Sequence, residues 1–244
     1  APGIFAAEVE DLVRLVAQNV SVEIRPREAV RVVGVLNDYP VVAVGEGVDA
    51  DWVGRRVAID PNIYCGQCDD CRDGRLQLCS NLTAIGVTRD GAFAEMCAVP
   101  LSQALPVPEG LSWEEAAMTE PVACCLHGID LLGLRAGQTV AVLGGGAIGL
   151  ILAQLARAQG ASDLVVSEPA APRRRVADEL GLEAVTPDRL PARLPKGADV
   201  VIEAVGSTAT AAQALDVARR GGVILFFGVT PMGKQIAIEP FQIF

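Results

Sequence analysis

A glycine-rich turn between an apolar run and a helical segment constrains the fold of this chain more than any other feature. The run Thr139–Leu143 reads TVAVL, the turn reads GGGAIG, and the next eleven residues read LILAQLARAQG. Gly144, Gly146 and Gly149 match the pattern G-x-G-x-x-G, which is informative only where a strand precedes it and a helix follows it. Both flanks are present, so the sequence predicts a strand, a tight turn and a helix.

Each of the three motif glycines is needed for a different steric reason. Gly144 permits the tight turn, Gly146 leaves room for a pyrophosphate to approach the backbone, and Gly149 lets the helix pack closely on the strand. The first N–H groups of the helix, around Ala147 and Ile148, have no partner within the helix and favour a bound anion. The segment is therefore predicted to bind the phosphates of a dinucleotide coenzyme.

Charged residues beyond the next apolar run bear on which dinucleotide binds. Glu168 ends that run, 19 residues after Gly149, and a carboxylate there would accept hydrogen bonds from the ribose hydroxyls and repel a 2′-phosphate. Arg173, Arg174 and Arg175 follow, and an arginine near the ribose can accommodate that phosphate. A solvated first helical turn is the alternative for at least one of the three. The carboxylate favours NAD, and NADP stays open.

Strands and helices alternate through the second half of the chain. Further strands are expected at residues 164–167, 184–185, 199–203 and 223–227. One of the helices between them is expected at Thr208–Arg219, ending at Gly221 and Gly222. Such alternation indicates a doubly wound parallel α/β sheet. The count is five strands, one fewer than the six of a full dinucleotide-binding fold.

Four cysteines are crowded into one short segment of the first half. Cys65, Cys68, Cys71 and Cys79 read C-x-x-C-x-x-C followed by seven residues and another Cys. Four thiolates at this spacing can close a tetrahedron around Zn²⁺ and leave no open position for a substrate. The predicted role of the zinc is therefore structural, holding together a lobe that has little apolar content of its own.

An iron–sulfur cluster and disulfides are the alternatives to zinc at these cysteines. An iron–sulfur cluster suits the first three, but ferredoxin runs place the fourth Cys three residues on and follow it with Pro. Disulfides fit an odd total of seven Cys poorly, and no secretory signal is evident. The remaining Cys97, Cys124 and Cys125 lie in apolar stretches and are expected to pack in the core.

Charge and hydropathy exclude several classes of partner. The formal charge is −10 and only ten residues are aromatic, which is a poor composition for binding nucleic acid. Residues 136–156 are uncharged for 21 positions, long enough to span a bilayer. Their three consecutive glycines and Gln154 instead favour a buried strand, turn and helix. No membrane partner is expected, and a cytoplasmic location is the default.

The chain resembles the zinc-containing medium-chain alcohol and polyol dehydrogenases, near the sorbitol and threonine dehydrogenase branch. The resemblance is carried by the segments DPNIYCGQCDDCRDGRLQLC, NLTAIGVTRDGAFAEMCAVP, EEAAMTEPVACCLHG, GGGAIG and SEP. It implies a β-rich GroES-like domain over residues 1–126, with the zinc lobe at 65–79. A Rossmann NAD-binding domain over residues 127–244, without its last strand, is expected to follow.

The resemblance also implies site residues. Glu120 matches a carboxylate beside the family's catalytic zinc, and Gly228 and Val229 match backbone positions near the nicotinamide. The family's motifs G-x-C-G-T/S-D and G-H-E, which bind that second zinc, are absent from this sequence. One replacement is an unusual site formed by Glu120, Cys124 and His127, which share one helix face at i, i+4 and i+7. The plainer alternative is that the last two simply pack.

The expected function is hydride transfer from a secondary alcohol or polyol to NAD, impaired in this chain because the catalytic-zinc motifs are absent. Two alternatives stay open: a binding protein that holds zinc and NAD without turnover, and a truncated gene product. Assembly into a homo-oligomer is a further possibility that the resemblance raises.

Overall fold

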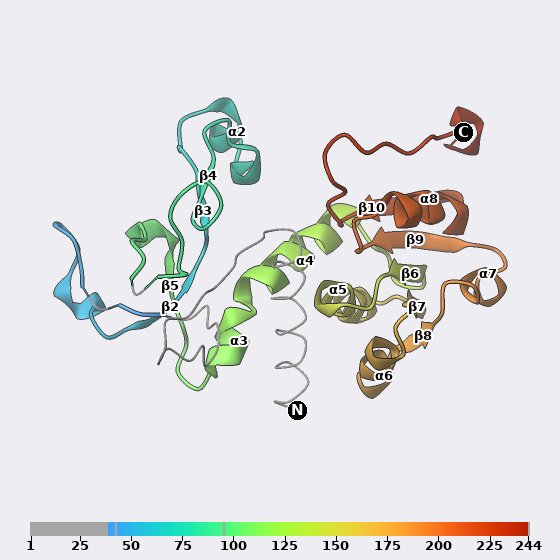
Figure 1. Ribbon diagram of the computed structural model, residues 1–244, viewed down its shortest axis with the longest axis horizontal. Coiled ribbons are helices and arrows are strands. Elements are labelled where there is room, and N and C mark those ends of the chain that lie inside the picture. The colour runs from blue at the N-terminus through green and yellow to red at the C-terminus, as the bar shows by residue number, and fades with distance from the viewer. Residues whose placement is uncertain (1–38, 42, 95, 244) are drawn as a thin grey trace, which may run out of the picture. The chain divides into compact units, whose positions relative to one another are not determined.

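The structure is a computed structural model that describes residues 39–41, 43–94 and 96–243. The described chain separates into two compact units, which divide in the sequence between Glu120 and Pro121. Figure 1 shows the elements of both units. The predicted start of the first domain, residues 1–38, lies outside the described residues, and the predicted boundary at residues 126 and 127 stays a prediction.

The unit that ends at Glu120 is built from short strands. They are β1 (Tyr39–Pro40), β2 (Arg56–Ile59), β3 (Asn62–Ile63), β4 (Thr83–Ala84) and β5 (Ala104–Pro106). The order β1-β2-β5 forms one antiparallel sheet, and β3 pairs with β4 in a second. The helical turns are η1 (Ala50–Trp52), α2 (Asp69–Arg72), η2 (Leu76–Leu78), η3 (Leu101–Gln103) and α3 (Trp113–Ala117).

The apolar core of this unit is small. Among its described residues, the buried apolar side chains are Val57, Cys71, Cys79 and Ala116. Two of these four are cysteines of the predicted zinc lobe, which extends between β3 and β4. Such a lobe needs something other than hydrophobic burial to hold it together.

The second unit contains a five-stranded parallel sheet of order β10-β9-β6-β7-β8. Its strands are β6 (Thr139–Leu143), β7 (Asp163–Ser167), β8 (Glu183–Val185), β9 (Ala198–Glu203) and β10 (Ala218–Phe226). Its helices are α5 (Ala147–Ala158), α6 (Ala171–Glu179), α7 (Leu190–Arg193), α8 (Thr208–Val217) and α9 (Pro240–Ile243), preceded by α4 (Thr119–Leu132). The predicted five-stranded parallel α/β sheet is confirmed.

Apolar side chains cover both faces of this sheet. On one face Val140, Val142 and Ile202 pack with residues of α5 and α6. On the other face Ala141 and Val201 pack with residues of α7 and α8. Burial on both faces explains why the strands read as continuous apolar runs. Because β6 pairs with β7 on one side and β9 on the other, the crossover direction reverses at β6, where ligands of such sheets bind.

Helix α8 ends two residues earlier than predicted. It stops at Val217, and Ala218 already pairs with Ala198 in β10 before the register shifts. Gly221 has a φ of +72°, and a Cβ at Gly222 would lie 3.0 Å from the Ala198 carbonyl oxygen. The two glycines therefore belong to an irregular stretch within the strand and do not cap the helix.

The uncharged stretch at residues 136–156 is split between β6, the glycine turn and α5. No helix within the described part of the chain combines the length and the apolar character needed to cross a bilayer. Of the three remaining cysteines, Cys125 is fully buried as expected. Cys124 is exposed and Cys97 is partly exposed, so the core-packing prediction is wrong for Cys124.

Candidate functional site

The glycine turn after β6 has a separate geometry at each glycine. Gly144 adopts a φ of +106°, and a Cβ there would lie 2.8 Å from Val205 Cγ2. A Cβ at Gly149 would overlap the carbonyl oxygen of Gly144. At Gly146, by contrast, an added Cβ would meet no atom within 4 Å. The first and last glycines are required by packing, whereas the middle one leaves open space.

Helix α5 begins beside that open space. Its N-cap is Gly146, with no side chain capping the first turn, and the first backbone bond of the helix runs from Leu150 N–H to the Gly146 carbonyl at 2.9 Å. The N–H groups of Ala147 and Ile148 precede that bond and have no partner within the helix. Together with the helix dipole they favour a negatively charged group.

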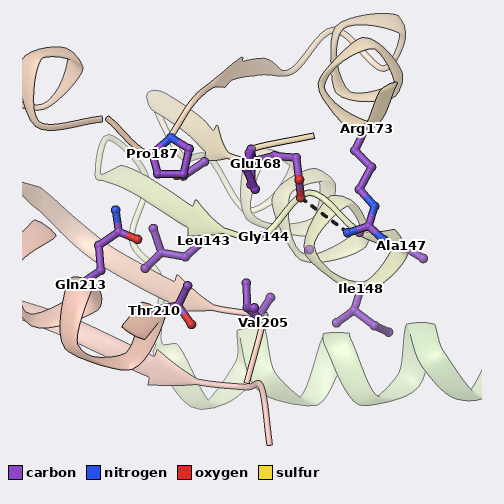
Figure 2. A pocket seen from close by; sticks show the side chains of 15 residues that line it. Leu143, Gly144, Ala147, Ile148, Glu168, Arg173, Pro187, Val205, Thr210 and Gln213 are labelled. Atoms are coloured by element: carbon purple, nitrogen blue, oxygen red, sulfur yellow. Dashed lines mark ion pairs between the residues drawn. The ribbon is translucent and has the colours of Figure 1, made fainter. Parts of the chain in front are cut away.

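A cavity of about 320 Å³ opens over the turn. It is lined by Leu143, Gly144, Gly146, Ala147, Ile148, Gly149, Ser167, Glu168, Pro169, Arg173, Pro187, Ala204, Val205, Thr210 and Gln213. These residues come from the carboxyl ends of β6, β7 and β9 and from the segments that follow β6, β7, β8 and β9 (Figure 2). Seven of the residues that the sequence predicts to bind the coenzyme therefore line one cavity.

Two predicted residues do not line this cavity. Gly228 donates its N–H to the Glu203 carbonyl oxygen at 2.8 Å, and a Cβ at Gly228 would lie 2.7 Å from Glu203 Oε2. Val229 is 90% exposed, and its backbone packs against Gly206. Both follow β10, next to the turn that carries Val205 of the cavity wall.

Glu168 is almost completely buried at the end of β7, with 3% of its surface exposed. Its Oε2 accepts the N–H of Gly145 at 2.9 Å, and its Oε1 accepts the N–H of Ala170 at 2.7 Å. Arg173 Nη1 lies 3.8 Å from the same Oε2. A Cβ at Gly145 would lie 2.9 Å from Glu168 Cβ. Gly145 is a variable position of the G-x-G-x-x-G pattern, so the pattern gives no signal of this contact.

The three consecutive arginines have different surroundings. Arg173 lines the cavity and its side chain is 32% exposed. Arg174 donates from Nη1 to the carbonyl oxygens of Glu168 at 2.8 Å and Pro169 at 2.6 Å. Arg175 is exposed. The arginine run thus divides into one residue at the cavity, one that holds the loop after β7, and one in solvent.

Glu203 is a second buried acid that sequence analysis did not single out. It ends β9 with 1% of its surface exposed, and its Oε1 accepts from Val205 N–H, Gly206 N–H and Thr210 Oγ1 at 2.7 to 2.9 Å. Its Oε2 has no hydrogen-bond partner among the described residues. An acid directly after the apolar run ADVVI was a usable signal, because Glu168 follows its own strand in the same way.

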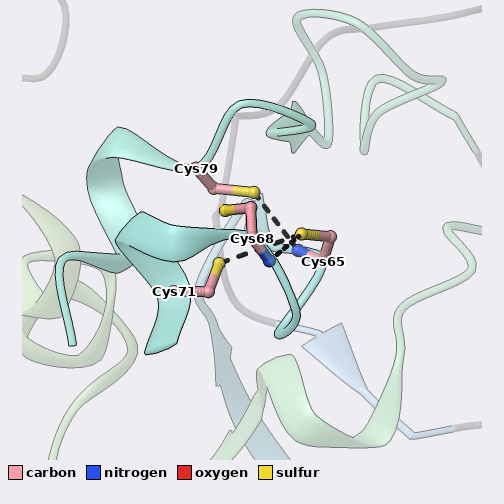
Figure 3. A group of neighbouring side chains, drawn as sticks. All are labelled: Cys65, Cys68, Cys71 and Cys79. Atoms are coloured by element: carbon pink, nitrogen blue, oxygen red, sulfur yellow. Dashed lines mark hydrogen bonds between the residues drawn. The ribbon is translucent and has the colours of Figure 1, made fainter. Parts of the chain in front are cut away.

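The four predicted cysteines converge in the first unit, with all four Sγ atoms within 4.8 Å of one another (Figure 3). Cys65 Sγ and Cys71 Sγ are 4.0 Å apart. Zn–S bonds of about 2.3 Å in a tetrahedron place sulfurs about 3.8 Å apart. The N–H of Cys65 lies 3.3 Å from Cys79 Sγ, and the N–H of Cys68 lies 3.4 Å from Cys65 Sγ. The donor set and its spacing fit a four-sulfur zinc site after small side-chain movements.

The thiols of this group differ in acidity. The backbone N–H groups of Gln67 and Cys68 stabilise the thiolate of Cys65 and lower its pKa to about 6. Burial raises the pKa of Cys71 to about 12. A cation at the centre would favour all four thiolates, because metal ligation requires deprotonated sulfur.

Glu120 lies in the first turn of α4 and is exposed, as are Cys124 and His127. Within the described part of the chain, the cysteine group is the only set of three or more His, Cys, Asp or Glu side chains placed to hold a metal. The structure therefore does not bring Glu120, Cys124 and His127 together as ligands.

Segments of both units match the models of known protein families. Residues 39–109 match the model of the alcohol dehydrogenase GroES-like domain, and residues 147–244 match the model of zinc-binding dehydrogenases. The chain belongs to the zinc-containing medium-chain alcohol and polyol dehydrogenases. The family resemblance and the expected fold, a GroES-like domain followed by a Rossmann-type sheet, are confirmed.

Two curated relatives in this family are named as dehydrogenases of sugar alcohols. D-altritol 5-dehydrogenase from Agrobacterium fabrum is 34% identical over 84% of this chain and 62% of its own length. Sorbitol dehydrogenase from Bacillus subtilis is 32% identical over 82% of this chain and 59% of its own length. The chain thus spans about three fifths of the length of the curated relatives it matches.

Solved structures agree with this assignment. A protein described as a zinc-binding dehydrogenase from Sinorhizobium meliloti 1021, bound to NADP, has a TM-score of 0.79 and 45% identity, covering 84% of this chain and 63% of that one. A protein from E. coli CFT073 described as a short chain alcohol dehydrogenase, complexed with NADH, has a TM-score of 0.75 and 27% identity, covering 82% and 61%.

Proposed function

We propose that the second unit binds a nicotinamide dinucleotide and that the protein transfers hydride between this coenzyme and a small alcohol or polyol. The observation that carries the proposal is the open space at Gly146 inside a cavity that also receives the N-terminus of α5. A side chain at this position would fill the place where a pyrophosphate approaches the backbone. NAD(P) is supported further by relatives solved with NADP and with NADH.

Different residues of the cavity are proposed to bind different parts of the coenzyme. The N–H groups of Ala147 and Ile148 would donate to the pyrophosphate, and Glu168 and Arg173 lie where the adenosine ribose is expected. Gly228 and Val229 remain our proposal for the nicotinamide end. A bound nicotinamide would supply the acceptor for the hydride that leaves the alcohol carbon, and the hydroxyl proton would pass to solvent.

The cysteine group is proposed to hold a structural zinc through Cys65, Cys68, Cys71 and Cys79. Four sulfur ligands close the coordination sphere, so this ion would fold the lobe and would not contact substrate. The small apolar core of the surrounding unit supports this role. Glu120 stays the candidate for a catalytic-zinc ligand on the family resemblance alone.

We expect this chain to oxidise alcohols slowly. The motifs that supply cysteine and histidine to the family's catalytic zinc are absent from the sequence, and without that Lewis acid the alkoxide is not stabilised. D-altritol and sorbitol dehydrogenases among the relatives favour polyols as the substrate class. A cytoplasmic location and a homo-oligomeric state remain predictions.

Calorimetric titration of the purified chain with NAD and with NADP, together with elemental analysis for zinc, tests the proposal. We expect one dinucleotide site and one zinc per chain, with little reduced coenzyme formed from sorbitol. Two zinc ions per chain with rapid reduction of the coenzyme would show that the catalytic site is complete. Absence of binding by both dinucleotides would overturn the proposed function.

A further inference from the structure

Glu203 lies between the two segments that carry the proposed ends of the coenzyme site. It ends β9, which pairs with β6 on one side and β10 on the other, so Glu203 lies beside Leu143 and Phe226 in the sheet. The glycine turn follows the first of these neighbours, and Gly228 follows the second. Glu203 does not line the cavity and is 1% exposed. Any effect of this residue on a ligand therefore passes through the residues that it holds.

The carboxylate of Glu203 holds the segment that follows β9. Its Oε1 accepts the N–H groups of Val205 and Gly206, both at 2.9 Å, and the hydroxyl of Thr210 at 2.7 Å. Val205 and Thr210 line the cavity (Figure 2). Val205 also packs on the glycine turn, since a Cβ at Gly144 would lie 2.8 Å from Val205 Cγ2. One buried oxygen therefore holds one wall of the cavity.

The same residue also holds the segment that follows β10. The main-chain carbonyl oxygen of Glu203 accepts the N–H of Phe227 at 2.9 Å and the N–H of Gly228 at 2.8 Å. The second carboxylate oxygen, Oε2, packs against Gly228, where an added Cβ would lie 2.7 Å from it. Glu203 thus contacts both segments, one through Oε1 and the other through its carbonyl and Oε2.

The two segments pack on each other through backbone atoms. A Cβ at Gly228 would overlap the backbone nitrogen of Gly206. A Cβ at Gly206, which has a φ of +77°, would lie 2.7 Å from the carbonyl oxygen of Val229. Close-packed atoms transmit displacement to their neighbours. A shift of the turn at Gly206 should therefore move Gly228 and Val229.

We propose that Glu203 is a positioning residue that sets the spacing between the cavity wall at Val205 and Thr210 and the segment of Gly228 and Val229. This inference rests on the proposed function, because the second segment is our proposed contact for the nicotinamide. A dinucleotide that spans both segments has to match their spacing, whereas a ligand that occupies only the cavity does not.

Hydrogen exchange of the full chain without coenzyme tests whether the two segments are coupled. Glu203→Ala removes the carboxylate and keeps the main-chain carbonyl that holds Phe227 and Gly228. We expect exchange at least about tenfold faster in peptides covering residues 205–210 and also in those covering residues 227–229, each relative to peptides of α6 in the same unit. The α6 peptides report any general loss of stability. Faster exchange confined to residues 205–210 would overturn the inference.

Asp199→Asn is the matched control for both measurements. Asp199 is an acid of the same strand, but it lies near the opposite end of β9 and bonds to Thr139 and Arg219. Its substitution should change exchange in both segments by less than about threefold relative to α6.

Calorimetric titration with NAD and with ADP tests the consequence for binding. ADP carries the adenosine and the two phosphates of the coenzyme but no nicotinamide. Glu203→Ala should weaken NAD about tenfold more than it weakens ADP, because a smaller folded fraction would lower both affinities equally. Glu203→Gln keeps an acceptor at Oε1, so its ratio of NAD to ADP affinity should stay within about threefold of the unsubstituted value, as should that of Asp199→Asn.

If Glu203→Ala does not fold, Glu203→Asp takes its place, because it keeps the charge and withdraws the carboxylate by one methylene group. It should lower the ratio of NAD to ADP affinity by about threefold or more and speed exchange in both segments. Equal weakening of NAD and ADP, or a ratio that falls as far in Glu203→Gln as in Glu203→Ala, would overturn the inference and leave dinucleotide binding intact. Loss of all binding in the unsubstituted chain would instead contradict the proposed function, and hydrogen exchange would still decide whether Glu203 couples the two segments.

Discussion

The Glu168 carboxylate accepts the backbone N–H of Gly145 at 2.9 Å across 23 positions of the chain. This bond ties the end of β7 to the turn between β6 and α5, and it requires glycine, because a Cβ at Gly145 would press on the Glu168 side chain. The turn that faces the coenzyme cavity is therefore shaped by a residue outside its own motif.

Alanine substitutions at the two neighbouring glycines should have opposite consequences. Gly145→Ala places a Cβ 2.9 Å from Glu168 Cβ, so we expect a loss of about 1–3 kcal/mol in the free energy of unfolding. Gly146→Ala adds a Cβ in open space at a φ of −76°. It should cost less than about 1 kcal/mol and yet abolish detectable dinucleotide binding.

Urea unfolding and calorimetric titration measure the two effects separately. Equal stability losses in both glycine variants would contradict the assigned geometry, as would unchanged coenzyme affinity in Gly146→Ala.

Substitutions of Glu203 test how much the hydrogen bonds to its Oε1 contribute to stability. Three donors converge on Oε1, while Oε2 has no partner among the described residues. Glu203→Gln keeps an acceptor oxygen for the donors and removes a buried charge, so it should cost less than about 1.5 kcal/mol. Glu203→Ala leaves three donors without their acceptor and should cost about 2–4 kcal/mol. Urea unfolding of both variants checks the difference, and similar losses would show that the donors do not depend on this oxygen.

The geometry of the four-cysteine group predicts that a substitution within the group lowers the zinc content, whereas a substitution at a cysteine outside it does not. Cys79→Ser removes one of four ligands and should lower the zinc content well below one ion per chain, since structural zinc contributes on the order of 10 kcal/mol to folding such lobes. Cys97→Ser is the control, because Cys97 lies outside the group. Elemental analysis and limited proteolysis report the result. Stoichiometric zinc in Cys79→Ser would argue against a four-sulfur site.

Asp199 should make part of the stability depend on acid pH. Its Oδ2 accepts the Thr139 N–H at 2.8 Å and its Oδ1 lies 2.6 Å from Arg219 Nη2; these contacts lower the pKa of Asp199. A lowered pKa in the folded state stabilises the fold at pH values above the unfolded pKa of about 3.9, and this contribution is lost as the pH falls through the folded value.

Asp199→Asn should therefore cost roughly 0.5–1 kcal/mol near neutral pH, a modest figure because Arg219 is partly exposed. The cost should shrink below about pH 4 as the unsubstituted carboxylate is protonated. Urea unfolding between pH 7 and about 3 follows the difference, with the exposed Asp216→Asn as the control. A cost independent of pH would show that the charge of Asp199 is not involved.

The sequence by itself determined the features that depend on local pattern. Five apolar runs, the helices between them and the glycine turn predicted the parallel sheet, because buried parallel strands and close helix packing restrict residue types along the chain. The spacing of the four cysteines predicted their convergence, because their ligand atoms lie within one short loop.

Only the tertiary structure decided which distant groups meet. Nothing in the sequence indicates that the Glu168 carboxylate bonds to the N–H of Gly145, because that bond depends on how two strands lie side by side. The division of roles between Arg173 and Arg175 depends on the face that α6 turns toward the cavity. Such contacts join segments far apart in the sequence, and no local periodicity records them.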